Sequence, residues 1–239
     1  MNERMKTLEN LLNEIGVSPA PAFYEDLLIF ENLLLETNRT LNLTAITDPA
    51  EILKKHYWDS LYSLSLSLFP QGAKVIDVGC GAGFPSIPLK LARRDLQITM
   101  TDSLQKRLNF IESVMRTLDL SGAETLHARA EDAGREPALR ERYDIAVSRA
   151  VAELNKLCEY CLPFVKQGGI LIAYKGANAV RELQNAENAI AALGGAVRNV
   201  YPYTLPGMED RRALIVIEKT GKTPDRFPRA PKQIKEKPL

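Results

Sequence analysis

The sequence predicts an α/β fold in which a mostly parallel sheet follows a helical appendage. Three observations predict this class. An apolar run over residues 75–78 leads straight into a glycine-rich loop, apolar runs then alternate with amphipathic helical patterns, and the first 70 residues carry helical periodicity. A chain of 239 residues is long enough to bury the core of one large domain with an appendage.

The composition is that of an ordinary globular protein. Hydrophobic residues make up 45% and charged residues 26% of the chain, which excludes the disordered and fibrous classes. The net charge of +1 means that local basic patches would have to hold any nucleic-acid partner. The sequence shows no signal peptide and no apolar run long enough to span a bilayer, so we expect a cytoplasmic protein with no membrane contact.

The three cysteines give no sign of a disulfide framework, because their number is odd and the expected compartment is reducing. Cys158 and Cys161 have the spacing of a redox or zinc motif, but no second pair or histidine cluster accompanies them. We therefore interpret them as packing thiols and expect no metal site.

Two amphipathic helices are predicted at the start of the chain. Hydrophobic residues recur at helical spacing over residues 5–15 and again over residues 23–34, with Gly16 ending the first pattern. Residues 38–44 are rich in hydrogen-bonding side chains and predict a loop of Asx and Ser/Thr turns. Residues 1–70 are thus predicted to form the helical appendage.

A third helix of the appendage is predicted after Asp48-Pro49, a pair typical of helix starts. This helix carries Lys54, Lys55, His56, Tyr57 and Trp58. In one interpretation the aromatic residues fill the seam between the appendage and the sheet while His56 pairs with Asp59. In the other, the cluster faces a substrate. The sequence leaves both open.

The loop after the first strand carries Gly79, Gly81 and Gly83, where the backbone must turn sharply and approach a ligand closely. Their spacing is not the GxGxxG pattern of dinucleotide sites. Asp77 ends the strand, and a carboxylate beside the glycines would repel a pyrophosphate but attract a cationic or amine-bearing ligand. We therefore predict S-adenosylmethionine (AdoMet) as the cofactor of this loop.

Seven strands are predicted, over residues 75–78, 96–101, 124–128, 143–148, 170–174, 196–205 and 211–219. The last two are expected to form a hairpin through residues 206–208, which adds an antiparallel strand. The result is a Rossmann-like, mostly parallel seven-stranded sheet with an antiparallel last strand over residues 71–220, the class I arrangement of AdoMet-dependent methyltransferases.

Charged residues follow the predicted strands. Asp102 ends the second strand, where it either binds the ribose hydroxyls of the cofactor or caps the helix that begins at Ser103. Lys106 and Arg107 lie near the start of that helix, where cations oppose the macrodipole, so we predict that they contact phosphate.

Glu131 follows the third strand, either next to an adenine edge or as a solvated loop charge. Arg149 lies at the C-terminal end of the fourth strand, and its guanidinium is a candidate for a bidentate contact with a carboxylate or phosphate. Residues 221–239 are rich in Lys, Arg and Pro and predict an extended basic tail, either solvated or laid along a phosphate backbone.

Several motifs together resemble one family over nearly the whole chain. They are Asn42-Leu-Thr44, His56-x-x-Asp59-Ser60, residues 77–85, Ser103-x-x-Lys106-Arg107, Arg129-Ala-Glu131, Ser148-Arg-Ala150, Pro228-Arg229 and Pro238-Leu239. On these residues the chain resembles the RsmG (GidB) family. Three positions depart from the family pattern: Cys80 replaces a small residue, Ser86 stands where many members have Gly, and Lys232 stands where the tail usually has Gly.

The resemblance implies an enzyme that transfers a methyl group from AdoMet to N7 of one guanine in 16S ribosomal RNA. Its substrate would be either the free RNA or the small ribosomal subunit. It also implies AdoMet contacts at Gly79, Phe84, Ala130, Glu131 and Arg149. Guanine N7 carries an available lone pair, so the reaction needs alignment and no general base. We therefore expect no catalytic residue in the strict sense, with Arg149 and His56 as positioning candidates.

For RNA, the candidate contacts are Arg39, His56, Lys106, Arg107, Lys175 and Arg211. We expect a monomer. Two other classes share parts of these patterns. A small-molecule methyltransferase would keep the glycine loop without needing the basic tail, and a non-catalytic RNA-binding or assembly factor would keep the basic residues without binding AdoMet.

Overall fold

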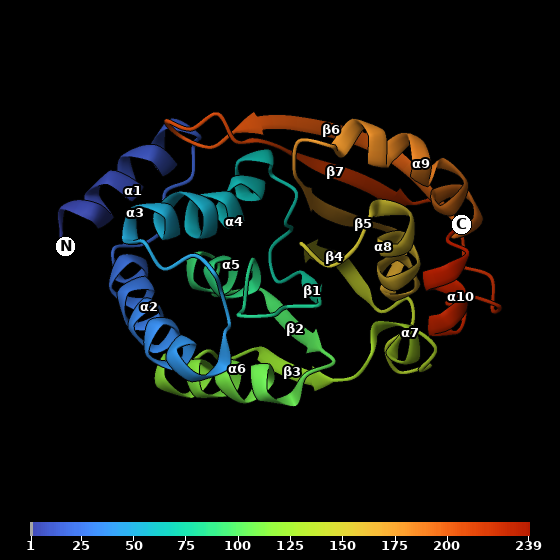
Figure 1. The fold of residues 1–239 in the computed structure, drawn as a ribbon, viewed down its shortest axis with the longest axis horizontal. Coiled ribbons are helices and arrows are strands. Elements are labelled where there is room, and N and C mark those ends of the chain that lie inside the picture. The colour runs from blue at the N-terminus through green and yellow to red at the C-terminus, as the bar shows by residue number, and fades with distance from the viewer. Residues whose placement is uncertain (1) are drawn as a thin grey trace.

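The computed structural model describes residues 2–239, and a twisted central sheet runs through it (Figure 1). The strand order is β3-β2-β1-β4-β5-β7-β6, with β7 antiparallel to both of its neighbours and the other pairs parallel. The strands are β1 (Lys74–Val78), β2 (Gln97–Asp102), β3 (Ala123–His127), β4 (Tyr143–Arg149), β5 (Val165–Lys175), β6 (Gly195–Thr204) and β7 (Arg211–Lys219). The predicted mostly parallel seven-stranded sheet is confirmed.

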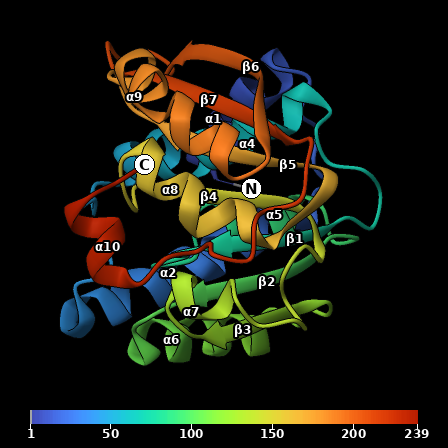
Figure 2. The same cartoon turned by 90° about the vertical axis from the view of Figure 1, so that its right-hand side faces the viewer.

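Helices cover both faces of this sheet. One face carries α1 (Glu3–Glu14), α2 (Ala22–Leu41), α5 (Ser86–Ala92) and α6 (Gln105–Thr117). The other carries α7 (Ala130–Ala133), α8 (Leu154–Cys161), α9 (Ala179–Ala192) and α10 (Pro231–Glu236). Figure 2 shows α8 and α9 in front of the sheet and α10 beside α8. Because both faces are covered, the central strands are buried over nearly their whole length.

β5 begins five residues earlier than the sequence indicates, at Val165 instead of residue 170. Gly168 and Gly169 lie within the strand, at an irregularity where the pairing with β4 shifts register. A Cβ on Gly169 would stand 2.5 Å from the carbonyl oxygen of Asp144, so this close approach of two strands requires glycine.

The two predicted helices of the appendage are confirmed as α1 and α2. Their apolar faces do not form a core of their own, because they belong to one continuous buried cluster that includes β1, α5 and α6. Phe30 of α2, for example, packs against Phe84 in the glycine loop, with ring centroids 5.4 Å apart. The appendage therefore lies directly against the loop, and its boundary at residue 70 stays a prediction.

The third predicted helix is composite. It begins with α3 (Pro49–Glu51), capped by the Asp48 carboxylate, continues as a π-helix over Ile52–Trp58 and ends in α4 (Asp59–Leu61) and a 3₁₀ turn over Tyr62–Leu66. Segments of π-helix are rare and occur frequently at functional sites. The ring of Trp58 packs against Tyr62 and against Tyr203 of β6, so the aromatic residues do fill the seam with the sheet.

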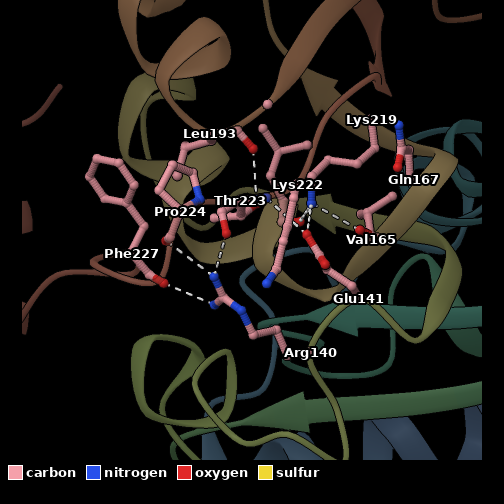
Figure 3. Close-up of polar contacts among 12 residues, drawn as sticks. Arg140, Glu141, Val165, Gln167, Leu193, Lys219, Lys222, Thr223, Pro224 and Phe227 are labelled. Carbon is pink, nitrogen blue, oxygen red and sulfur yellow. Dashed lines mark hydrogen bonds and ion pairs between the residues drawn. The ribbon is translucent and has the colours of Figure 1, made fainter.

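The C-terminal segment folds back over the α8 and α9 face, contrary to the extended tail expected from its composition (Figure 2). Phe227 and Ile234 are buried. The guanidinium of Arg140 donates to the carbonyl oxygens of Thr223, Pro224 and Phe227 (Figure 3). These contacts tie the first part of the segment to the loop before β4.

Two cations near the C-terminal end of the chain pair with carboxylates distant in sequence. Lys219 is fully buried and donates to Glu141, which also accepts from the backbone of Thr223 (Figure 3). The guanidinium of Arg229 forms a bidentate ion pair with the carboxylate of the buried Glu159 of α8. The composition predicted solvated or phosphate-bound cations, but pairing with carboxylates distant in sequence places part of this charge inside the fold.

Candidate functional site

A cavity of about 550 Å³ opens at the carboxyl ends of β1, β2 and β4, where ligands bind in open α/β sheets. It is lined by backbone and side chains of the glycine loop, by residues that follow three strands and by the appendage. The residues are Leu43, Thr44, His56, Val78, Gly79, Cys80, Gly81, Ala82, Phe84, Thr101, Asp102, Ser103, Arg107, Ala128, Arg129, Ala130, Glu131, Arg149, Ala150, Val151, Ala152 and Tyr160.

The glycine loop forms the floor of this cavity. Gly79 and Cys80 donate their backbone N–H groups to the carbonyl of Thr101, which ties the loop to β2. Gly79 has a φ of +77°, and a Cβ there would stand 2.5 Å from a methyl group of Val151. The tight turn and close approach predicted for this loop are therefore present, and glycine is required for both.

Two residues predicted to bind the cofactor lie outside the cavity. Gly83 lines none of it, because it packs against Ile87 and Ile111 beneath the loop. Asp77 is fully buried, and the Ser86 hydroxyl donates to its carboxylate. Burial raises the pKa of Asp77 to about 7. Ser86, which departs from the family pattern, thus supplies a hydrogen bond to Asp77.

Asp102 braces the cavity wall. Its carboxylate accepts from the backbone N–H of Gly81 (3.0 Å) and of Leu104 (2.9 Å) and from the guanidinium of Arg107 (3.3 Å). The helix begins at Gln105 instead of Ser103, with Leu104 as its N-cap and no side-chain cap, so Asp102 closes a turn before the helix and does not cap it. The same residue lines the cavity. Ribose binding by Asp102 stays a prediction.

Glu131 and Ala130 begin the short helix α7 at the end of β3, and both line the cavity. Glu131 is nearly buried, with the guanidinium of Arg129 at 3.9 Å. Its position places one carboxylate on the β3 side of the cavity, away from the appendage, and adenine recognition there stays a prediction.

Arg149 joins the sheet to the appendage. Its guanidinium donates to the Asp59 carboxylate (2.8 Å), to the carbonyl of Lys55 (3.0 Å) and to Nδ1 of His56 (3.2 Å). The same guanidinium lies over the ring of Phe84, 5.1 Å from its centroid. Much of its donor capacity is thus used within the protein, which the sequence alone did not indicate.

His56 is neutral. Its ring stacks on Phe84, with centroids 4.2 Å apart and planes inclined by 13°. Burial, followed by the nearby charge of Arg149, lowers the pKa of His56 to about 3. The local pair of His56 with Asp59 considered from the sequence does not form, because Arg149 lies between them and bonds to both.

The remaining basic candidates fall into two groups. Arg39, Lys106 and Arg211 are exposed. Lys175 is buried instead, where it pairs with Glu182 (2.7 Å) and donates to the carbonyl of Ala152. The structure thus brings His56 and Arg107 into the cavity wall, leaves three cations at the surface and places Lys175 inside an ion pair.

Sequence reasoning missed part of the wall. Thr44, Val151 and Tyr160 line the cavity, and none was among the predicted site residues. For Thr44 a signal existed, because it lies in one of the family motifs and in a segment dense in hydrogen-bonding side chains. Tyr160 lies on α8 with no local pattern that marks it.

The described residues, 2–239, contain no group of three or more His, Cys, Asp and Glu side chains that could hold a metal ion. Cys80, Cys158 and Cys161 are buried, and burial raises the pKa of each thiol. None of the helices in that part of the chain is both long and apolar enough to cross a membrane.

Solved methyltransferase structures share the fold at low sequence identity. TrmN from Thermus thermophilus superposes with a TM-score of 0.52 at 17% identity, covering 70% of this chain and 53% of its own. Geranyl diphosphate methyltransferase in complex with SAM gives a TM-score of 0.50 at 14% identity, covering 64% and 81%. These similarities support the class I fold, and the reaction has to be argued from the site.

Related sequences identify the family of the chain more specifically than the structures that share its fold. Ribosomal RNA small subunit methyltransferase G of Alkaliphilus metalliredigens is 44% identical over 237 residues, 99% of each chain. The protein of the same name from Clostridium perfringens strain SM101 is 43% identical over 232 residues, 97% of each chain. The family model GidB, described as rRNA small subunit methyltransferase G, matches residues 23–211. These matches confirm the resemblance seen in the motifs, and the chain belongs to the rRNA small subunit methyltransferase G (GidB) family.

Proposed function

We propose that this protein transfers a methyl group from AdoMet to N7 of one guanine in small-subunit ribosomal RNA. The observation that carries the proposal is that one cavity is built jointly by the glycine loop and by the appendage. The loop supplies a floor for a nucleoside-like cofactor, and the appendage supplies a wall where a second substrate has to enter. The family of the chain and the names of its relatives support ribosomal RNA as that second substrate.

The residues present suit AdoMet. Gly79 allows the loop to pack closely against Val151, where a Cβ would clash. The carboxylates of Asp102 and Glu131 line the same cavity, and we propose that they accept hydrogen bonds from the ribose and the adenine. Phe84 and Arg149 close the side next to the appendage. When bound, AdoMet supplies an activated methyl group, and its transfer to a lone pair leaves the S–C bond electrons on sulfur.

The candidate bases His56, Asp102 and Asp77 are not free to act as a general base, and Glu131 stands apart from the appendage on the β3 side of the cavity. Both ring nitrogens of His56 are engaged in hydrogen bonds, and its pKa is far below neutrality. Three donors occupy the carboxylate of Asp102, and Asp77 is sealed beneath the loop. This supports an acceptor such as guanine N7, which carries a free lone pair and loses no proton. The protein then contributes alignment and exclusion of water.

RNA contacts are assigned to the exposed cations Arg39, Lys106 and Arg211 and to Arg107 at the cavity. Lys175 is not proposed as a contact, because its charge is already paired inside the fold. Since the substrate is ribosomal RNA, we place the reaction in the cytoplasm.

The test uses purified protein, AdoMet labelled in its methyl group, and small subunits or 16S RNA from a strain that lacks the gene. Borohydride reduction and aniline cleavage followed by primer extension map N7-methylguanine. We expect label in the RNA and one new cleavage site. Calorimetry with AdoMet runs in parallel.

Each alternative class gives a different result. AdoMet binding without methylation of any small-subunit RNA would point to a small-molecule methyltransferase. No AdoMet binding, together with RNA binding, would point to an assembly factor. Label at more than one guanine, or at another atom, would overturn the proposed specificity.

A further inference from the structure

Thr44 is held unusually firmly for a loop residue. Its backbone N–H donates to Oδ1 of Asn38, and its carbonyl accepts from Nδ2 of the same side chain, each at 2.9 Å. One amide thus fixes both polar groups of the Thr44 backbone. Since Thr44 also lines the cavity, these two bonds hold the residue in a fixed position there.

The polarity of the hydrogen bonds around Thr44 follows from Arg149. A guanidinium can only donate, so Nδ1 of His56, 3.2 Å from Nη2, accepts. In a neutral imidazole the other nitrogen then carries the proton, and Nε2 of His56 donates to Oγ1 of Thr44 over 2.9 Å. The pKa of His56, lowered by burial and by Arg149, agrees with the neutral ring.

The Thr44 oxygen has no acceptor capacity left. A second donor, the backbone N–H of Ile46, reaches the same Oγ1 at 3.0 Å. A hydroxyl has two lone pairs and one proton, so both lone pairs are occupied and only the proton remains. No acceptor within residues 2–239 takes this proton. Thr44 therefore offers the cavity a hydrogen-bond donor and cannot offer an acceptor.

We propose that the Thr44 hydroxyl selects guanine by donating a hydrogen bond to O6 of the base whose N7 receives the methyl group. The proposal rests on the proposed function. Guanine presents N7 and O6 side by side as two acceptors, whereas adenine presents N7 beside the N6 amino donor. A fixed donor at this place pairs with guanine and faces another donor in adenine, which leaves both unpaired.

Donation to O6 also leaves the reacting atom free. The lone pair of N7 forms the new N–C bond, the S–C bond of AdoMet breaks with its electrons returning to sulfur, and the positive charge passes to the purine. A donor directed at N7 itself would occupy that lone pair. Thr44 is thus a specificity-determining residue that identifies the base through the neighbouring atom.

The test combines a protein change with a substrate change. Thr44→Val removes the hydroxyl at nearly constant volume, and 2-aminopurine at the mapped target position keeps N7 but removes O6. We expect Thr44→Val to slow methylation of the guanine RNA by about 10- to 100-fold, the effect of one buried hydrogen bond. On the 2-aminopurine RNA, Thr44→Val and the wild type should react equally. Thr44→Ser should stay within a few-fold of the wild type on guanine.

Calorimetry and a matched variant separate this role from a structural one. The affinity for AdoMet should be unchanged in Thr44→Val. Thr40→Val serves as the control, because Thr40 is exposed on α2 and lines no part of the cavity. If Thr44→Val does not bind AdoMet, Thr44→Ala repeats the measurements.

Three results would overturn the assignment while the proposed function stands. They are a wild-type rate for Thr44→Val on guanine, equal slowing by Thr44→Val on both RNAs, and loss of AdoMet binding in both the Val and the Ala variant. A wild-type protein that leaves guanine unmethylated would instead overturn the proposed function, and the O6 contact with it.

Discussion

Arg149 and Asp59 form a buried ion pair, 2.8 Å long, that joins the end of β4 to the appendage. The side chains are 11% and 1% exposed. The Asp59 carboxylate also accepts from the Tyr203 hydroxyl at 2.7 Å, so β6 holds it from the opposite side. The wall of the cavity thus depends on a contact between three segments far apart in the chain.

Asp59→Asn should destabilise the protein strongly, because it leaves the Arg149 charge buried without its partner. Breaking a buried pair in this way costs about 3–5 kcal/mol. AdoMet affinity should fall too, since Arg149 lies over Phe84 in the cavity wall. Urea denaturation and calorimetry measure the two effects.

Asp225→Asn is the matched control for this change. Asp225 pairs with Lys222 at the surface, where the side chains are 88% and 70% exposed, and such pairs contribute about 0–1 kcal/mol. If the two variants lost the same stability, the Arg149–Asp59 pair would not be the junction described here.

Gly79→Ala should abolish AdoMet binding at micromolar concentrations. The new Cβ would stand 2.5 Å from a Val151 methyl group in the cavity wall, at a φ of +77°. Gly72→Ala provides the comparison, because Gly72 has a φ of +66° and open space around it. Gly72→Ala should cost about 1–2 kcal/mol of stability from backbone strain and leave AdoMet affinity unchanged. Equal affinities for the two variants would mean that the cofactor does not use this loop.

The contribution of Asp77 to the free energy of unfolding should decrease as the pH rises, whereas that of a salt-bridged surface carboxylate increases. Burial raises the pKa of Asp77 from 3.8 to about 7, so the folded state holds its proton more tightly than the unfolded state. Its contribution is therefore complete below about pH 4, declines as the pH rises to about 7, and is level above that. Denaturation at several pH values, with Asp77→Asn as the reference, measures the decline.

Two variants check the sign of this effect. Ser86→Ala removes a hydrogen bond that lowers the pKa of Asp77, so the decline in stability should extend to higher pH.

At Asp144 burial acts to raise the pKa, but hydrogen bonds from Lys166 and from the Lys74 backbone lower it overall. Relative to Asp144→Asn, the wild type should therefore gain stability as the pH rises through the acid range. A decline there would contradict the assignment.

Arg140→Ala should release the C-terminal segment. The variant loses four hydrogen bonds, to the carbonyl oxygens of Gly134, Thr223, Pro224 and Phe227. Phe227 is buried in the wild type, so trypsin should cleave the bond between Arg226 and Phe227 readily only in the variant, as mass spectrometry of the fragments would show. Arg135→Ala is the control, because Arg135 makes one exposed bond of 3.4 Å to the same segment. Equal cleavage of both variants would show that Arg140 does not hold the segment.

The sequence predicted those parts of the molecule that local patterns encode. The apolar runs give the strands, and the glycines after Val78 give the loop, because both depend on residues that are neighbours in the chain. The positions of Asp102, Glu131 and Arg149 at one sheet edge follow from parallel strands ending together.

Pairings between distant residues escaped this reasoning. Nothing near Arg149 in the sequence shows that it bonds to residues 55–59, and nothing near Lys175 shows that Glu182 and the Ala152 carbonyl enclose its charge. The basic C-terminal segment was misjudged for the same reason, because its partner Glu159 lies 70 residues earlier. Composition shows which charges exist, whereas tertiary contacts decide which of them meet solvent.

The order of strands also bears on how the chain assembles. β7 lies between β5 and β6, so β6 has no neighbour on the sheet until the later strand has formed. We therefore expect β6 to join the sheet with β7 as a hairpin or after it, and the pairing of β7 with the distant β5 is a non-local step. Trp58 is the single tryptophan of the chain, and it packs against Tyr203 on that hairpin. Its fluorescence during refolding should thus report the moment at which the hairpin docks and the seam closes.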